Sequence, residues 1–320
     1  MTMNRDGADN TASVARPVPM LRRGDVVGVA APASPVPREE FLLSLHRLQR
    51  MGLRPRFRDD LFDRHLYLAR SDAARASELA ELFLDPEIKA VFCACPGYGS
   101  LRVLPHLPWD EIRQHPKFFM GYSDLTALLV GLTTCGGFCT FHGPALVPGF
   151  LSEFLTARTW RAVRQTLLKG TSGKSVHVSR AVALGTGCGS GPLVGGNLEM
   201  LTSLLGTPWE PRTAGGVLFI EEVGEGEETL DQRLTHLRLA GKLDGVKAVL
   251  FGDMSRNDLT PPYRVLDVVK NVLGDLGVPV LIGFPAGHGR HNLPLVLGAR
   301  YSVCADSRTV TQLDPGMEIA

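Results

Sequence analysis

The first half of the chain alternates short apolar runs with segments of helical periodicity. The run DVVGVAAP at residues 25–32 predicts a buried strand, and apolar residues between positions 38 and 51 recur at helical spacing. The strand LRPRF (53–57) precedes a second predicted helix, for which Ser71 is a suitable N-cap and Pro86 a stop. This alternation is typical of a mostly parallel sheet with helices on both faces.

The same pattern continues to the middle of the chain. Strands are predicted at KAVFCAC (89–95), KFFMG (117–121) and GFCTF (137–141), with a helix from Ser123 to Leu132. In open sheets of this kind, ligands bind at the carboxyl ends of the strands. Residues that directly follow these strands are therefore the first candidates for a site.

The second half follows a different pattern. Residues 169–190 are rich in Gly and Ser and predict a linker, and the chain beyond them combines strands at GVLFIEE, VKAVLFGDM and VPVLIGF with helices near 229–240 and 263–276. The alternating segment 299–314 predicts a closing pair of strands. We expect an α/β protein with a disordered tail (1–20), a parallel-sheet domain (21–168), the linker, and a mixed β-rich α/β domain (191–320).

Composition narrows the classes of function. The formal net charge is +1, from 34 basic and 33 acidic residues that are interspersed, which argues against a nucleic-acid partner. Hydrophobic residues make up 44% without a long apolar tract, so no membrane span is expected. The N-terminal residues lack the apolar segment of an export signal, which favours a cytoplasmic location and, for the six cysteines, reduced and buried thiols. The cysteine spacings do not match zinc sites, so we expect neither metal nor cofactor.

Ser123 lies in the sequence GYSD, where a predicted strand gives way to a helix. A tight turn at such a junction can present a serine hydroxyl at the rim of a sheet. Serine is also a preferred N-cap, and this structural role is at least as common on local sequence alone. The motif departs from G-x-S-x-G because Leu125 occupies the second glycine position.

Two further residues occupy strand ends. Glu221 follows four apolar residues directly, and a carboxylate in that position needs a partner to offset its desolvation. His288 lies in the loop PAGHG after the strand VPVLIGF. An acidic run is usually a solvated surface, and a single loop histidine is usually structural. The chain order Ser, acid, His is that of α/β-hydrolases, however, and favours a catalytic triad.

A glycine-rich loop, PGYGS at residues 96–100, precedes the serine. It lacks the lysine of a P-loop, so phosphate binding is only weakly indicated. Backbone N–H groups of Gly97 and Asp124 are better candidates for an oxyanion hole, in which each donor contributes about 3 kcal/mol. His142, also at a strand end, is interpreted as a structural residue or as a support for the site.

With these residues in place, the chain resembles the LD-carboxypeptidase family of serine peptidases, which includes the microcin-immunity peptidases, from about Leu21 to Leu313. The resemblance implies a Rossmann-like N-terminal domain, a Ser-His-Glu triad across a domain interface, no metal and a homodimer. The matching segments are GDVVGVAAPAS, PGYGS, GYSD, FHGP, GPLVGGNL, LFIEEVGE and PAGHG. Within these segments we assign substrate binding to Tyr98, Gly99 and Asn197, and we add Arg290 because it lies beside His288.

The expected reaction is release of the terminal D-alanine from murein tetrapeptide by cleavage of an L,D amide bond during peptidoglycan recycling. Two alternatives remain, hydrolysis of peptidyl or aminoacyl adenylates and a catalytically inactive ligand-binding homologue. The sequence departs from the family at Cys95-Pro96-Gly97, where Arg-Gly-Gly is usual, and in the segment that follows the catalytic glutamate. There the family carries a Tyr-Arg pair and a further Arg, and this chain has Glu227, Glu228, Thr229 and Gln232. The acidic rim that results would suit a more cationic substrate.

Overall fold

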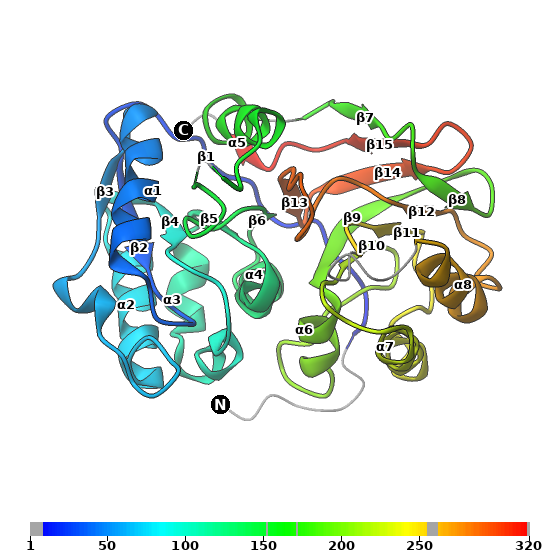
Figure 1. Cartoon of the computed structure of the whole chain (residues 1–320), viewed down its shortest axis with the longest axis horizontal. Helices are drawn as coiled ribbons and strands as arrows, with labels where there is room; N and C mark the ends of the chain where they lie inside the picture. Colours follow the sequence, from blue (N-terminus) through cyan, green and yellow to red (C-terminus); the bar gives the residue numbers. More distant parts are fainter. Residues whose placement is uncertain (1–8, 152, 171, 255–261, 319–320) are drawn as a thin grey trace.

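The computed structural model describes residues 9–151, 153–170, 172–254 and 262–318. Residues 1–8 of the predicted tail lie outside the described residues. Figure 1 shows two sheet-containing halves side by side, with the N-terminal strands and helices in one half and most C-terminal elements in the other. This arrangement confirms the predicted α/β class with one mostly parallel and one mixed sheet.

The N-terminal half is built on a six-stranded sheet of order β13-β6-β5-β4-β2-β3. Neighbouring strands are parallel except β13, which runs antiparallel to β6. The chain thus returns from its C-terminal half to complete this sheet. The strands are β2 (Val26–Ala30), β3 (Arg54–Arg56), β4 (Ile88–Cys93), β5 (Phe118–Gly121), β6 (Thr140–His142) and β13 (Leu295–Leu297).

The second sheet has eight strands in the order β7-β15-β14-β9-β10-β11-β12-β8. Its central strands β9 to β12 are parallel, and the outer pairs are antiparallel, which makes the sheet mixed. The strands are β7 (Ser175–His177), β8 (Val182–Leu184), β9 (Cys188–Asn197), β10 (Val217–Glu221), β11 (Ala248–Phe251), β12 (Val280–Ile282), β14 (Arg300–Cys304) and β15 (Thr309–Gln312).

Helices pack around both sheets, and several begin where the sequence predicts. The Ser71 side chain accepts a hydrogen bond from the Ala74 N–H, as expected of an N-cap. No helix of the described residues is long and apolar enough to cross a membrane. The helices are α1 (Arg38–Arg50), α2 (Asp72–Leu84), α3 (Trp109–Gln114), α4 (Thr126–Thr134), α5 (Ala157–Lys169), α6 (Leu198–Ser203), α7 (Glu227–Leu239) and α8 (Pro262–Leu273). Short 3₁₀ helices are η1 (Asp59–Phe62), η2 (Ser100–Arg102), η3 (Leu104–His106) and η4 (Ser123–Leu125).

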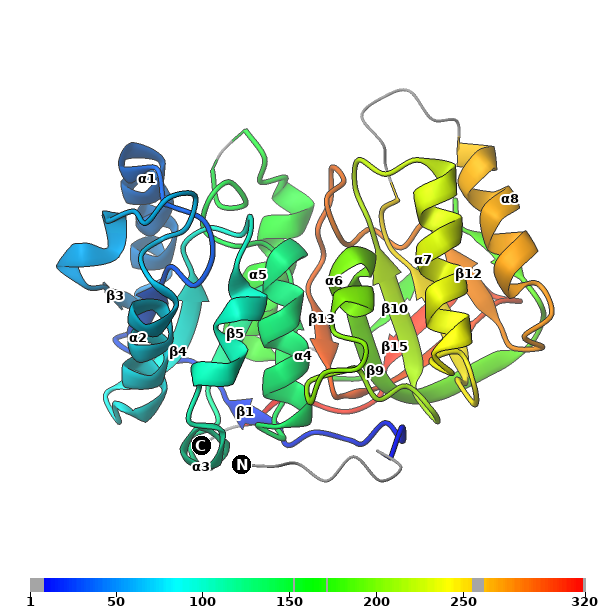
Figure 2. The same ribbon diagram turned by 90° about the horizontal axis from the view of Figure 1, so that it is seen from below.

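The segment predicted as a disordered tail is ordered from residue 9 onward. Its backbone N–H groups at Ala12 and Arg16 donate to the carbonyls of Ala214 and Gly137, one in each half, and β1 (Val18–Pro19) pairs with β16 (Met317–Glu318). Figure 2 shows this segment running beneath both halves. The prediction was wrong for these residues because their partners are remote in sequence. Likewise, β7 and β8 lie within the segment predicted as a linker.

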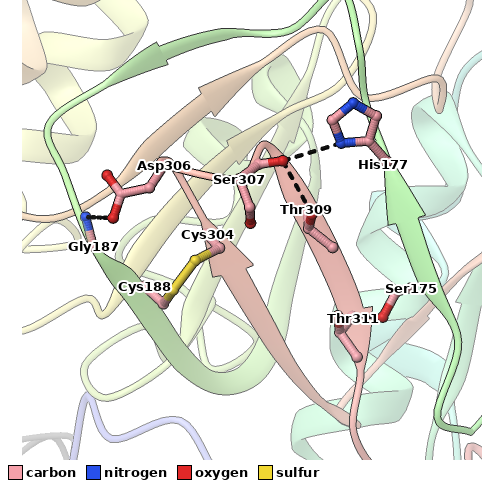
Figure 3. Close-up of a disulfide and its surroundings, with 9 residues drawn as sticks. All are labelled: Ser175, His177, Gly187, Cys188, Cys304, Asp306, Ser307, Thr309 and Thr311. Carbon is pink, nitrogen blue, oxygen red and sulfur yellow. Dashed lines mark hydrogen bonds between the residues drawn. A yellow bond between two sulfur atoms is a disulfide. The ribbon is translucent and has the colours of Figure 1, made fainter.

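The cysteines include one disulfide, between Cys188 on β9 and Cys304 on β14 (Figure 3). The two residues lie directly opposite each other in the antiparallel pair, so the expectation of reduced thiols throughout was wrong here. The sequence did not indicate this pairing because the two cysteines are 116 residues apart. The other cysteines are free, and no group of three or more His, Cys, Asp or Glu among the described residues could hold a metal ion.

Candidate active site

Ser123 lies on a sharp turn between β5 and α4. Its φ of 60° is positive, which is uncommon for a residue other than glycine and marks stored backbone strain. The residue before it, Tyr122, is the N-cap of η4 and makes no side-chain capping bond, and the Ser123 hydroxyl bonds to none of the described residues. The helix-capping alternative is therefore not what the structure shows. The strained turn is the geometry of a nucleophile elbow.

Glu221 and His288 meet although they are far apart in sequence. The Glu221 carboxylate, at the end of β10, accepts a hydrogen bond of 2.7 Å at Oε2 from His288 Nδ1. Glycine is required beside them, because a Cβ on Gly287 would lie 2.7 Å from Glu221 Oε2 and its φ is +113°. The Tyr122 ring packs against the imidazole with 4.9 Å between ring centroids. This contact places His288 beside the residue that precedes Ser123.

The two partners shift each other's pKa. Burial by itself would raise the pKa of Glu221, but the hydrogen bond from His288 and the nearby imidazoles of His288 and His142 lower it to about 2. Burial opposes the charged form of His288, yet the hydrogen bond and charge of Glu221 raise the pKa of its imidazole above 6.5. The pair is thus an ionised acid that stabilises an imidazolium, the arrangement a general base requires.

Asp124 ties the elbow to the glycine-rich loop. Its buried carboxylate accepts hydrogen bonds from the N–H groups of Gly99 at 3.0 Å and Ser100 at 2.9 Å. Burial raises the pKa of this carboxyl. From the other side, the buried Arg75 guanidinium donates to the Gly99 carbonyl at 2.8 Å. These contacts fix the loop relative to Ser123.

Gly97, an oxyanion-hole candidate, sits where only glycine fits. Its φ is +123°, and an added Cβ would lie 2.1 Å from Ser34 Oγ. The same Ser34 hydroxyl accepts a hydrogen bond from the Tyr98 N–H at 3.0 Å. The conformation of this loop is therefore set by Ser34 and Asp124 together.

Two cavities flank the Tyr122–Ser123 peptide. One, of about 250 Å³, is lined by Ser123, Asp124 and the loop residues Gly97, Tyr98 and Gly99. The other, of about 390 Å³, is lined on one side by Tyr122, His288 and Arg290. Ser123 and His288 therefore line two different cavities, one on each side of this peptide.

The structure distributes the expected substrate-binding residues between these cavities. Asn197 lines the Ser123 cavity but is buried, where it caps α6 and donates from Nδ2 to Glu222 Oε1 at 2.9 Å. Tyr98 is 56% exposed and packs edge-on against Tyr67. Arg290 is exposed in the His288 cavity.

Two features of the site were not evident from sequence. Glu222 belongs to the acidic run after β10, which is usually a solvated surface, but it is buried and ion-paired with Arg233 at 2.8 Å. Phe154, in the cavity with His288, is 58% exposed. The burial of Glu222 could have been inferred from its position directly after a buried strand. The second lies in an irregular segment that has no sequence motif.

Two family models match this chain. Residues 27–143 match the model of the LD-carboxypeptidase N-terminal domain, and residues 190–303 match that of the LD-carboxypeptidase C-terminal domain. The chain belongs to the LD-carboxypeptidase family. A relative from Bacillus subtilis (strain 168), named "probable murein peptide carboxypeptidase", is 35% identical over 90% of this chain and 92% of its own length. Membership in this family supports the general assignment of the chain as a peptidase.

Solved structures of other LD-carboxypeptidase relatives have the same fold. A muramoyltetrapeptide carboxypeptidase from Oxalobacter formigenes superposes with a TM-score of 0.81 at 27% identity, covering 92% of this chain and all of that one. A structure titled as MccF in complex with glutamyl sulfamoyl guanosine gives a TM-score of 0.86 at 26% identity, covering 94% and 99%. The fold is thus shared by relatives whose names point to two different substrate classes.

Proposed function

We propose that this LD-carboxypeptidase is a serine peptidase with Ser123 as nucleophile, His288 as general base and Glu221 as the residue that orients the imidazole. The observation that carries this proposal is the 2.7 Å bond from His288 Nδ1 to Glu221, which leaves Nε2 free to face a hydroxyl. The strained turn at Ser123 supports it. Ser123 and His288 form no hydrogen bond in the structure, and in serine peptidases this bond commonly tightens in the substrate complex.

In the proposed reaction, Ser123 Oγ attacks the scissile carbonyl carbon while His288 Nε2 takes the hydroxyl proton. The tetrahedral intermediate collapses, the C–N bond breaks, and His288 returns the proton to the leaving amine. Water then attacks the acyl-enzyme, giving its proton to His288, which passes it to Ser123 as the acid leaves. Glu221 stays ionised throughout, consistent with its lowered pKa.

The N–H groups of Gly97 and Asp124 are the proposed oxyanion donors. Both residues line the cavity that contains Ser123, and the Asp124 carboxylate fixes the loop between them. Pro96 has no N–H, so the hole cannot include a donor at that position. Two positioned donors are sufficient to stabilise the oxyanion by several kcal/mol, at about 3 kcal/mol for each.

The proposed substrate is a murein-derived tetrapeptide from which the terminal D-alanine is released. The name of the Bacillus subtilis relative supports this class. The proposal includes peptidoglycan recycling as the role, a cytoplasmic location and a homodimer. Fractionation of cells and light scattering of the purified protein test the last two.

The deciding experiment is release of D-alanine from murein tetrapeptide by the wild-type protein and by Ser123→Ala. We expect loss of at least about 10³-fold in kcat for the variant, because the covalent route is removed. Equal turnover by both proteins would reject the nucleophile. No turnover of any amide by the folded wild type, together with tight peptide binding, would favour the inactive ligand-binding alternative.

A second candidate substrate is a peptidyl or aminoacyl adenylate. The specific observation in its favour is Phe154, an exposed aromatic ring in the His288 cavity on which a base could stack. Phe154→Ala should then raise KM for an aminoacyl adenylate substrate, and Ki for an aminoacyl sulfamoyl adenosine inhibitor, while leaving KM for the tetrapeptide unchanged. An equal effect on both substrates would remove this argument.

A further inference from the structure

His142 is a completely buried histidine that the proposed catalytic steps do not use. It ends β6, where it pairs with Gly121 of β5 and Leu295 of β13, and its side chain is 0% exposed. Gly121 lies two residues before Ser123. His142 therefore belongs to the strand next to the one that carries the nucleophile.

Neither ring nitrogen of His142 has a hydrogen-bond partner among the described residues. Its ring packs edge-on against Phe219 of β10, with 4.9 Å between centroids. A histidine that serves only to fill a core normally satisfies its polar atoms, since an unpaired buried polar group costs about 1–3 kcal/mol. The surroundings of the ring therefore bear on what His142 does.

A carboxylate oxygen of Glu221 lies close to the His142 ring. Nε2 lies 3.7 Å from Glu221 Oε1, beyond a hydrogen bond but within the range of an ion pair. Glu221 Oε1 is itself buried and has no hydrogen-bond partner, while Oε2 is bonded to His288. The carboxylate thus lies between two imidazoles, one from each half of the molecule.

We propose that His142 is a positioning residue: its Nε2 faces Glu221 Oε1 across 3.7 Å and fixes the carboxylate plane, so that Oε2 stays on His288. This inference rests on the proposed function. A carboxylate held at one oxygen can rotate about its terminal torsion, which is broad for glutamate. A second donor on the other oxygen removes that freedom and keeps His288 aligned with Ser123.

Other polar and charged groups lie near Glu221 and His288 and also influence the titration of His288. Glu221 lies next to Tyr122, and the carboxylates of Glu222 and Asp253 also act on His288. None of these is altered by changing His142. A change in the titration of His288 in a His142 variant would therefore report on Glu221.

The experiment compares His142→Phe, which keeps an aromatic ring against Phe219 but has no donor, with His142→Gln, which keeps an N–H near the position of Nε2. We measure the His288 imidazole titration by NMR of ¹⁵N-histidine-labelled full-length protein, and the pH profile of kcat and KM. His142→Phe should lower the His288 titration midpoint by about one pH unit and kcat by about 10-fold, with KM nearly unchanged. His142→Gln should restore both.

Thr140→Val is the matched control, because Thr140 is a buried residue of the same strand that bonds to Leu129 and Thr133 and not to Glu221. It should lower stability without moving the His288 titration. If His142→Phe fails to fold, His142→Asn replaces it, since its shorter amide cannot reach Glu221. An unchanged His288 midpoint in a folded donor-less variant overturns the inference.

The two proposals fail in different ways. A wild-type protein with no Ser123-dependent hydrolysis would reject the proposed function, while the NMR titration would still decide the position of Glu221. Normal hydrolysis with an unaffected His142→Phe would reject only the role of His142.

Discussion

His288 Nδ1 donates to Glu221 Oε2 across 2.7 Å although the residues are 67 positions apart in the chain. The bond joins the end of β10 to the loop after β12, both in the mixed sheet. Ser123, the proposed nucleophile, follows β5 of the other sheet. Catalysis by this site would therefore depend on how the two halves are held together.

The pH dependence of activity should follow His288. Its pKa is raised above 6.5, and a general base must be neutral, so kcat/KM should fall as pH decreases through a midpoint above 6.5. Glu221→Gln removes the charge that raises this pKa while burial remains. The midpoint should then move below 6.5, and kcat should fall by about 10²- to 10⁴-fold. If kcat/KM of Glu221→Gln falls at low pH with the same midpoint as the wild type, Glu221 is not the partner that raises the pKa of His288.

Gly97→Ala should be more damaging than an ordinary glycine substitution. At Gly97 the Cβ meets Ser34 Oγ at 2.1 Å, whereas at Gly137, with φ of +71°, nothing lies within 4 Å. Gly137→Ala should cost only backbone strain, about 1–2 kcal/mol in the free energy of unfolding measured in urea. Gly97→Ala should lower the free energy of unfolding by more than this amount and should also lower kcat. In a double-mutant cycle, Ser34→Gly should recover part of the loss, and equal costs at both glycines would refute the steric argument.

Asp124→Ala should loosen the glycine-rich loop. It leaves the buried N–H groups of Gly99 and Ser100 unpaired, at about 1–3 kcal/mol for each group. We expect a lower unfolding free energy and a kcat reduced by about 10-fold or more, because the loop carries a proposed oxyanion donor. Asp124→Asn keeps one acceptor and should be intermediate. If Asp124→Ala is as stable and active as the wild type, these bonds do not hold the loop.

The Cys188–Cys304 bond should be detectable by thiol titration. Protein denatured without reductant should show four reactive thiols, those of Cys93, Cys95, Cys135 and Cys139, and six after reduction. Cys304→Ser should lower the unfolding free energy by about 2–4 kcal/mol, and reductant should have no further effect on that variant. Six thiols before reduction would show that the bond does not form.

The sequence determined the elements and the candidate chemistry. Apolar periodicity located most strands and helices, and the positions of Ser123, Glu221 and His288 directly after strands marked them as site residues, because parallel strands present their carboxyl ends on one edge. Ordered motifs over nearly the whole chain then indicated the family. These signals are local, so one sequence was sufficient to read them.

Tertiary structure alone decided the long-range pairings. It placed His142 against Glu221, joined Cys188 to Cys304, sent β13 back to the N-terminal sheet, and bound residues 9–20 to both halves. It also formed the cavity that Phe154 and His288 line together. Each depends on which segments become neighbours when the apolar faces of two sheets are buried, and local periodicity carries no information about that choice.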